Sequence, residues 1–268
     1  MTRLISGLVL AVVALLAILF LPLVALRALA CGVAAMAAHE YLAITGTGRR
    51  SAQVVVIFIV AYACWAMASY APSSGVGAAD PLLLVFAAMA IAVGWVAIAV
   101  LFAGRTIQDA AVDVVAPAYI GLPLGMLVGV HAHIGWRATL LLIGTIVVSD
   151  SAQYYTGRAF GRRPLAPTIS PKKTIEGAVG GVIFGIAFLT VGVAFVVPNP
   201  HLLRAAILAA VVVALGIIGD LFESRLKRVA GMKDSSNLIP GHGGVLDRID
   251  ALLFATPAFY FAMMRGLL

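Results

Sequence analysis

Residues 202–219 have the sequence LLRAAILAAVVVALGIIG, and the carboxylate of Asp220 follows directly. Apart from Arg204, this stretch is apolar throughout. A helix needs about 20 mostly apolar residues to cross a bilayer. The stretch therefore predicts a membrane-spanning helix that ends at a charged residue.

The rest of the chain is also mainly apolar. It has 268 residues, of which 63% are hydrophobic and 11% are charged, and its mean hydropathy is +1.09. Soluble domains contain about 45–50% apolar and about 25% charged residues. The composition excludes a soluble monomer, and it excludes a disordered chain because disorder requires low hydrophobicity. We expect an all-α polytopic membrane protein.

Nine segments are long and apolar enough to be membrane spans: residues 4–21, 23–42, 52–70, 81–102, 115–130, 137–155, 175–197, 202–219 and 249–264. The first has no small-residue cleavage site before a polar mature sequence, so we interpret it as a retained span. The segment 115–130 contains two prolines and three glycines and is the least regular. Since all loops are short apart from two polar segments, we expect a single domain, 1–268.

The distribution of Lys and Arg predicts the orientation. With nine spans, all but four of the 18 basic residues lie on one side, the exceptions being Arg27, Arg137, Arg204 and Arg265. Lys and Arg are enriched in cytoplasmic loops. We therefore expect a multi-pass protein of the cell (plasma or inner) membrane, with a cytoplasmic N-terminus. The net charge of +7 follows largely from this bias, so we expect no nucleic-acid partner.

Two polar segments, 150–177 and 220–250, interrupt the apolar sequence. Ten of the 18 basic residues fall within 158–173 and 225–248, which indicates an anionic ligand on the cytoplasmic side. The two cysteines, Cys31 and Cys64, lie in apolar runs and predict neither a disulfide framework nor a zinc site.

In the first polar segment, Asp150 lies at membrane depth, where a carboxylate is a functional candidate by default. An ion pair with Arg158 is the structural alternative. Ser170 and Pro171 predict a helix start, as N-cap and first helical residue, with free amides and the lysines Lys172 and Lys173 forming an anion site. Lysines solvated among lipid headgroups are the alternative there. Gly177, Gly181 and Gly185 recur every fourth residue and predict a bare face for helix packing.

In the second polar segment, five acids and five bases occur within 31 residues. Asp220 and Glu223 are one helical turn apart, as are Asp247 and Asp250. Such oxygen ligands suit Mg²⁺, which typically takes one or two carboxylates together with substrate phosphates. Between them, residues 240–244 (PGHGG) form a glycine-rich loop whose amides can close on a phosphate.

The order of residues from Ser224 to Asp250 resembles the signature of the phosphatidate cytidylyltransferases, also called CDP-diacylglycerol synthases. It contains Ser224, Leu226-Lys227-Arg228, Lys233-Asp234, Ser236, Ile239-Pro240, His242-Gly243-Gly244 and Asp247-Arg248-Ile249-Asp250. The block 170–174 (SPKKT) with Glu176-Gly177 resembles the same family. Gln153 and Ile175 depart from its pattern, but neither position carries metal or phosphate chemistry.

The resemblance implies that CTP and phosphatidic acid give CDP-diacylglycerol and pyrophosphate with Mg²⁺, in phospholipid biosynthesis. It implies metal ligands Asp220 and Asp247, with Asp250, Asp150 and Glu223 as second choices. Lys227, Arg228 and Lys233 would hold the phosphates of CTP or pyrophosphate, and Lys172 and Lys173 one of the two phosphate groups. Ser224 and the loop His242-Gly243-Gly244 would contact substrate, and Arg248 would bind substrate or hold Asp247. The resemblance also implies a homodimer.

Two other functions compete with this interpretation. A CTP-dependent kinase of a polyprenol or phytol alcohol would also need CTP, Mg²⁺ and membrane helices, with Asp150 or His242 as general base. A transporter of an anionic solute would place its charges at the bilayer midplane. The gathering of polar residues on one face favours an enzyme that takes CTP from the cytosol and its lipid from the inner leaflet.

Overall fold

A computed structural model describes residues 2–46, 50–69, 90–95, 97, 100–101, 107–236, 238–239, 241 and 243–268. These residues are almost entirely helical, which confirms the all-α class, and their one sheet is a two-stranded hairpin. The chain divides into two compact units, Met1–His133 with Ala230–Arg248, and Ile134–Val229 with Ile249–Leu268.

The first unit contains helices α1 (Thr2–Phe20), α2 (Leu23–Thr45), α3 (Arg50–Ser69), α5 (Ile107–Ala116) and α6 (Leu122–His133). Helix α3 packs against α2 and α6, and Leu26, Ala68 and Val128 form a buried cluster. A Cβ atom at Gly125 would lie 2.6 Å from the carbonyl oxygen of Cys64. Glycine therefore permits the close approach of α6 to α3.

The predicted irregularity of residues 115–130 is confirmed. A π-helical turn, η1 (Pro117–Gly121), interrupts the helical stretch between α5 and α6. Proline lacks the backbone N–H that a regular helix needs at this position, and π-turns insert where the ordinary ladder is broken.

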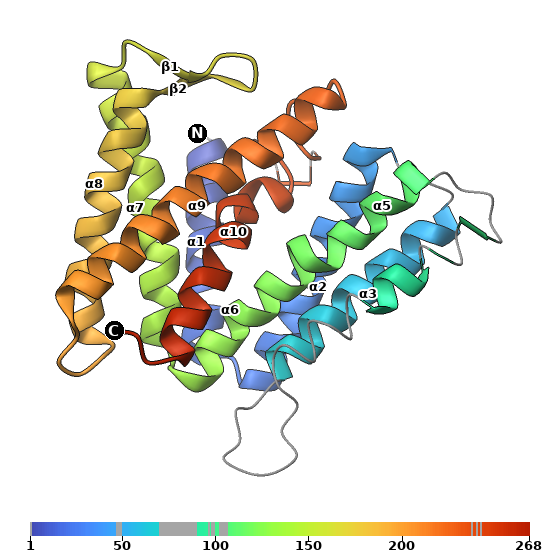
Figure 1. Cartoon of the computed structure of the whole chain (residues 1–268), viewed down its shortest axis with the longest axis horizontal. Helices are drawn as coiled ribbons and strands as arrows, with labels where there is room; N and C mark the ends of the chain where they lie inside the picture. The colour runs from blue at the N-terminus through green and yellow to red at the C-terminus, as the bar shows by residue number, and fades with distance from the viewer. Residues whose placement is uncertain are drawn as a thin grey trace. The chain divides into compact units, whose positions relative to one another are not determined.

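The second unit contains α7 (Trp136–Phe160), α8 (Ile175–Gly192), η2 (Val193–Phe195), α9 (Leu202–Val229) and most of α10 (Leu246–Met264). Helices α7 and α8 lie side by side, and the hairpin joins their ends (Figure 1). A Cβ atom at Gly181 would lie 2.9 Å from the carbonyl oxygen of Ser149 on α7. The predicted packing role of the glycines on α8 is thereby confirmed.

The predicted helix start at Ser170 is wrong. Strand β1 (Pro164–Ala166) pairs antiparallel with β2 (Ser170–Thr174), and α8 begins only at Ile175. The side chain of Thr174 caps the helix by accepting a hydrogen bond of 3.1 Å from the backbone N–H of Gly177. Pairing with β1 gives the segment with the two lysines hydrogen-bond partners outside a helix, so these lysines lie on a strand.

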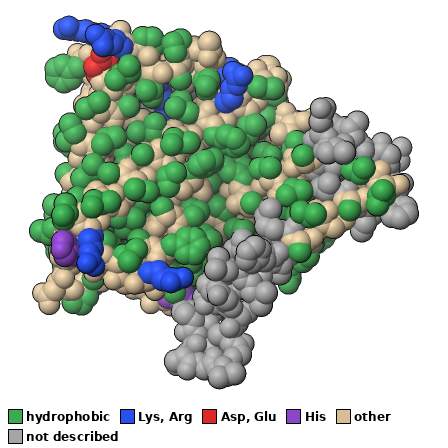
Figure 2. Space-filling model, viewed as in Figure 1, with side chains coloured by type: hydrophobic (Ala, Val, Ile, Leu, Met, Phe, Trp, Pro, Cys, Tyr) green, Lys and Arg blue, Asp and Glu red, His purple; other side chains and the backbone are tan. Residues whose placement is uncertain are grey.

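Five helical stretches among the described residues are long and apolar enough to cross a membrane: 23–45, 52–69, 111–133, 175–195 and 202–229. Large hydrophobic side chains such as Phe58, Phe184 and Ile207 are exposed on the protein surface, and hydrophobic side chains are spread over the face shown in Figure 2. The chain is a multi-pass membrane protein. Most of the expected span 81–102 lies outside the described residues, and the count of nine stays a prediction.

Candidate functional site

Helix α9 carries the first part of the second polar segment, residues 220–229. It continues past the expected span end at Gly219 to Val229. Asp220, Glu223, Ser224 and Lys227 therefore recur at i, i+3, i+4 and i+7 of a single helix. Residues with this spacing lie on the same helical face.

A cleft of about 460 Å³ opens in the second unit beside Asp220. Cations, carboxylates and hydroxyl groups share its lining, which consists of Asp150, Gln153, Tyr154, Gly157, Arg158, Ser170, Lys172, Lys173, Thr174, Gly177, Ala178 and Asp220. Helices α7, α8 and α9 and strand β2 all contribute. The structure thus brings together four residues that the sequence predicted as site residues: Asp150, Lys172, Lys173 and Asp220.

Asp220 contacts both a cation and a hydroxyl group. The ammonium group of Lys173 forms an ion pair with Oδ2 of Asp220, across 47 residues of chain. The hydroxyl group of Ser224, one turn further along α9, lies 3.3 Å from Oδ1 of Asp220. Both side chains of the ion pair are about one-quarter exposed, so they remain accessible to a ligand in the cleft.

Negative charge is concentrated around Asp220. Asp250 on α10 interacts electrostatically with the carboxylates of Asp220 and Asp150, and with the ammonium group of Lys227. Its own Oδ1 accepts a hydrogen bond of 2.7 Å from the backbone N–H of Ala251. Gln153 donates a hydrogen bond of 3.0 Å to Asp150. Carboxylates from three helices therefore lie near enough to interact electrostatically, a distribution of charge that favours a bound cation.

Glu223 and Lys227 interact within the helix. Glu223 is fully buried and forms an ion pair with Lys227, which is itself 8% exposed. Arg228, by contrast, is exposed, and its Nε donates a hydrogen bond of 3.3 Å to the carbonyl oxygen of Ile169 in the hairpin. Neither Lys227 nor Arg228 lines the cleft. In this conformation Lys227 helps to neutralise the buried Glu223, and Arg228 connects α9 to the hairpin that carries the lysines.

Asp247 lies in the first unit, at the start of α10. Its Oδ2 atom accepts hydrogen bonds from the backbone N–H of Ser235 at 2.9 Å, the hydroxyl of Ser235 at 2.8 Å and the backbone N–H of Gly244 at 2.7 Å. Gly243 has a φ of +77°, a conformation that glycine adopts without strain. The carboxylate therefore closes the glycine-rich loop onto the segment that precedes it.

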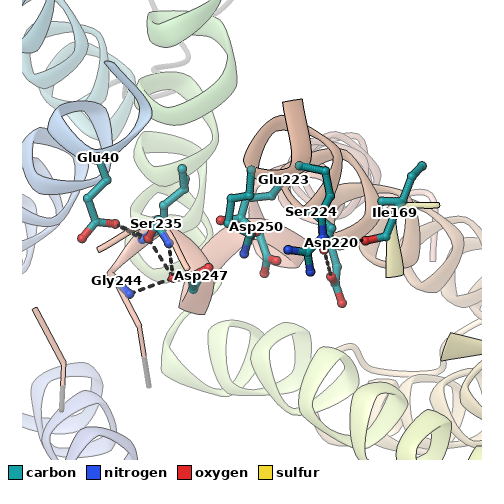
Figure 3. A network of polar contacts seen from close by, with 12 residues as sticks. Glu40, Ile169, Asp220, Glu223, Ser224, Ser235, Gly244, Asp247 and Asp250 are labelled. Atoms are coloured by element: carbon teal, nitrogen blue, oxygen red, sulfur yellow. Dashed lines mark hydrogen bonds and ion pairs between the residues drawn. The ribbon is translucent and has the colours of Figure 1, made fainter. Parts of the chain in front are cut away.

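Glu40 on α2 is a functional candidate that the sequence interpretation missed. It is 4% exposed, and its two oxygens accept hydrogen bonds from Ser235, Ser236, Val245 and Leu246. Figure 3 shows Glu40 and Asp247 with their hydrogen bonds converging on Ser235. A signal was available, because Glu40 is a carboxylate within an apolar span, where ionisable residues are functional candidates.

Residues lining the cleft were also missed on α7. Gln153, Tyr154 and Gly157 follow Asp150 at i+3, i+4 and i+7, so extending the helical face of Asp150 predicts them. Lys233 and Arg248 are exposed in the first unit, and their predicted roles stay predictions. His242 lies outside the described residues.

The donor set of the cleft fits a magnesium ion held jointly with a substrate. Within the described parts of the chain, no three His, Cys, Asp or Glu side chains are arranged as a ready-made metal cage. Mg²⁺ seldom uses such a cage, since it binds one or two carboxylates together with substrate phosphates. Asp220, with the charge of Asp150 and Asp250 nearby, supplies carboxylate oxygens, and Lys173 and Lys172 supply cations for phosphate.

Comparison with known proteins agrees with this chemistry. A sequence model of the cytidylyltransferase family matches residues 1–265. The phosphatidate cytidylyltransferase of Aquifex aeolicus (strain VF5) is 44% identical over 127 residues, 47% of each chain. That of Haemophilus influenzae is 42% identical over 138 residues, 49% of this chain and 48% of the relative. That of Bacillus subtilis (strain 168) is 34% identical over 163 residues, 59% of this chain and 60% of the relative.

The matched stretch spans about half the length of the first two relatives and somewhat more of the third. The family match, in contrast, extends over nearly all of the chain and includes both polar segments and the helices that carry them. The chain therefore belongs to the cytidylyltransferase family.

Proposed function

We propose that this protein is a phosphatidate cytidylyltransferase, which transfers CMP from CTP to phosphatidic acid and releases pyrophosphate. Family membership supports nucleotidyl transfer, and the relatives described above carry this name. The observation that carries the proposal is the cleft in which Lys172, Lys173 and Asp220 meet.

The charges of the cleft suit a reaction between two polyanions. CTP and phosphatidate repel each other, so a catalyst must neutralise both while it aligns them. The cations Lys172, Lys173 and Arg158 provide positive charge in one cleft. A solute transporter would need no carboxylate paired with these cations, whereas phosphoryl chemistry with a divalent ion uses both signs of charge.

The proposed chemistry needs no general base. The nucleophile is a phosphate oxygen of phosphatidate, and the second pKa of comparable phosphomonoesters is about 6, so the group is mostly dianionic at neutral pH. This oxygen attacks the α-phosphorus of CTP, and the bond from the α-phosphorus to the bridging oxygen breaks as pyrophosphate leaves. Lys173 and Lys172 would hold phosphate oxygens and reduce the charge repulsion during this step.

Mg²⁺ is part of the proposal. Asp220 would hold the ion, with Asp150 and Asp250 as further carboxylates, and the bound ion would supply charge neutralisation at the phosphates. Lys173 would then exchange its contact with Asp220 for one with substrate phosphate. Asp247, the other predicted ligand, lies in the first unit and is tested separately below.

The proposal extends to the arrangement in the membrane. We place the cleft on the cytoplasmic side of the cell membrane and expect nine spans with a cytoplasmic N-terminus, because the basic residues concentrate on that side. A homodimer is implied by the family resemblance. Its test is the mass of the protein in detergent, after subtraction of the bound detergent; a monomer at all concentrations would contradict it.

The decisive experiment follows a labelled phosphate. The purified protein is incubated in detergent with phosphatidic acid, Mg²⁺ and CTP labelled at the α-phosphate. We expect label in the organic phase, release of pyrophosphate and loss of both on chelation. Label that stays in aqueous CDP and appears only when a lipid alcohol is supplied would indicate a lipid kinase instead.

A variant of Asp220 tests the metal assignment. Replacement of Asp220 by Asn should raise the Mg²⁺ concentration for half-maximal activity and lower the maximal rate by about 100-fold or more, because a ligand is lost. An unchanged Mg²⁺ dependence would remove Asp220 from the proposed metal site.

A further inference from the structure

The segment that carries the glycine-rich loop is attached to helix α2 through one side chain. Oε1 of Glu40 accepts hydrogen bonds from the Ser236 hydroxyl at 2.7 Å and the Val245 backbone N–H at 3.0 Å. Oε2 accepts from the Ser235 hydroxyl at 2.9 Å and the Leu246 backbone N–H at 2.8 Å. A single buried carboxylate thus binds both ends of the segment 235–246.

The attachment is placed where it controls Asp247. Two of its donors, Val245 and Leu246, immediately precede Asp247 in the chain. Ser235 lies between the two acids: its backbone N–H donates to Asp247, and its one hydroxyl hydrogen is within reach of both carboxylates. The backbone N–H groups at the start of α10 also favour a negative charge, because a helix N-terminus carries partial positive charge. Glu40 therefore contacts the backbone at the position where α10 begins.

The packing leaves no room for a side chain at Gly244. A Cβ atom at Gly244 would overlap both the Ser235 hydroxyl and the Glu40 carboxylate. Glu40 and Ser235 are 4% and 3% exposed. A buried carboxylate with four donors is costly to leave unpaired, so the loss of any of these contacts destabilises the attachment.

We propose that Glu40 is a positioning residue for cytidylyl transfer: it anchors residues 235–246 to α2 and thereby holds Gly244 and Asp247 in the positions that activity requires. This inference rests on the proposed function. Glu40 itself would contact no substrate, because it acts through the loop and through Asp247.

The test compares Glu40→Gln with Asp113→Asn in the purified full-length protein. The glutamine has the same shape, but its NH₂ group faces one serine hydroxyl and one backbone N–H. The hydroxyl can accept from this group, whereas the backbone N–H loses its acceptor. Asp113 is the matched control, because it is also a buried acid of the first unit, 3% exposed, and accepts a hydrogen bond of 3.2 Å from Trp95. We expect turnover to fall by about tenfold or more in Glu40→Gln, the effect of losing a charged hydrogen bond. Asp113→Asn should stay near wild type.

Two readouts separate positioning from general destabilisation. The Mg²⁺ concentration for half-maximal activity should rise in Glu40→Gln, because Asp247 is a predicted ligand, and should not change in Asp113→Asn. Hydrogen exchange should become faster at the amides of Val245 and Leu246 in Glu40→Gln. Where this variant does not fold, Ser236→Ala removes one donor and should give the same changes at smaller size.

Each outcome has a definite meaning. Wild-type turnover in Glu40→Gln, or equal losses in Glu40→Gln and Asp113→Asn, would overturn the positioning role. Unchanged exchange at Val245 and Leu246 would contradict the anchor itself, whatever the activity. A wild-type protein that makes no CDP-diacylglycerol would refute the proposed function, while the exchange experiment would still decide whether Glu40 holds the loop.

Discussion

Lys173 and Asp220 illustrate how much of the site depends on single side chains. Each lies in an apolar chain where charge is scarce, and the two form an ion pair with each other. The carboxylate of such a pair can bind a metal ion, and its ammonium group can bind phosphate. A neighbouring lysine, Lys172, is more exposed and lines the same cleft, so the two lysines differ in their surroundings although they are adjacent in sequence.

Replacement of Lys173 by Met should lower turnover by about 10- to 100-fold, since a charge-assisted contact with phosphate is lost. The matched control is Arg225→Met, which removes an exposed cation from α9 outside the cleft and should leave turnover near wild type. Both expectations are tested by measuring the initial rates of the two variants at saturating CTP. Equal effects of the two substitutions would mean that only the general positive charge of the region matters.

Asp247 can be tested for charge without loss of its hydrogen bonds. In Asp247→Asn the side-chain carbonyl oxygen can replace Oδ2 and accept from Ser235 and Gly244, while the negative charge disappears. We expect a folded protein with an unchanged unfolding midpoint and no measurable turnover. Near-normal activity would remove the charge of Asp247 from the mechanism and leave it a loop-closing residue.

At the scale of elements, the position of the cleft depends on the packing of α7 against α8. Gly177, Gly181 and Gly185 bring the two helices together, and the hairpin that joins them carries the lysines. Helix α9 then supplies Asp220 at the end of its apolar stretch. A change in the spacing between α7 and α8 would therefore alter the cleft without touching a charged residue.

Gly181→Ala should destabilise the protein by about 1–3 kcal/mol, because its Cβ would lie 2.9 Å from the Ser149 carbonyl oxygen and overpack the interface. Gly32→Ala on α2 is the control, since a Cβ there meets nothing within 4 Å. Alanine is the better helix former by about 1 kcal/mol, so this control should be neutral or stabilising. The unfolding midpoints of the two variants are measured by thermal unfolding in detergent. A similar decrease in the midpoint of both variants would contradict the close packing.

At the scale of the whole molecule, the question is on which side of the membrane the hairpin lies. Thr168 in the hairpin turn and His201 before α9 are both exposed and flank α8. An 18-residue helix is about 27 Å long, close to the thickness of the hydrocarbon core. The two positions therefore serve as markers for opposite sides of the membrane.

Single cysteines at these positions, in a chain carrying Cys31→Ala and Cys64→Ala, test the orientation. We expect a membrane-impermeant maleimide to label His201→Cys in intact cells and Thr168→Cys only in inside-out vesicles. The reverse pattern would place the cleft outside the cytoplasm and contradict the predicted orientation. Labelling of both cysteines from the same side of the membrane would mean that α8 does not span it.

Much of this protein follows from the sequence by itself. Membrane helices depend on hydropathy summed over contiguous residues, the glycine face of α8 depends on a four-residue repeat, and the face shared by Asp220 and Ser224 depends on helical spacing. The family signature is likewise a linear pattern. These are local properties, which is why the all-α class and the polar segments could be predicted from composition and spacing alone.

Only the tertiary structure decided which charges meet. Lys173 pairs with Asp220 across 47 residues, and Glu40 reaches Ser235 across 195, distances over which no periodicity operates. The start of α8 was decided in the same way, because strand pairing with residues 164–166 satisfies the backbone that a helix would otherwise have used. A lone carboxylate in an apolar helix has many conceivable partners, and the packing of the helices selects among them.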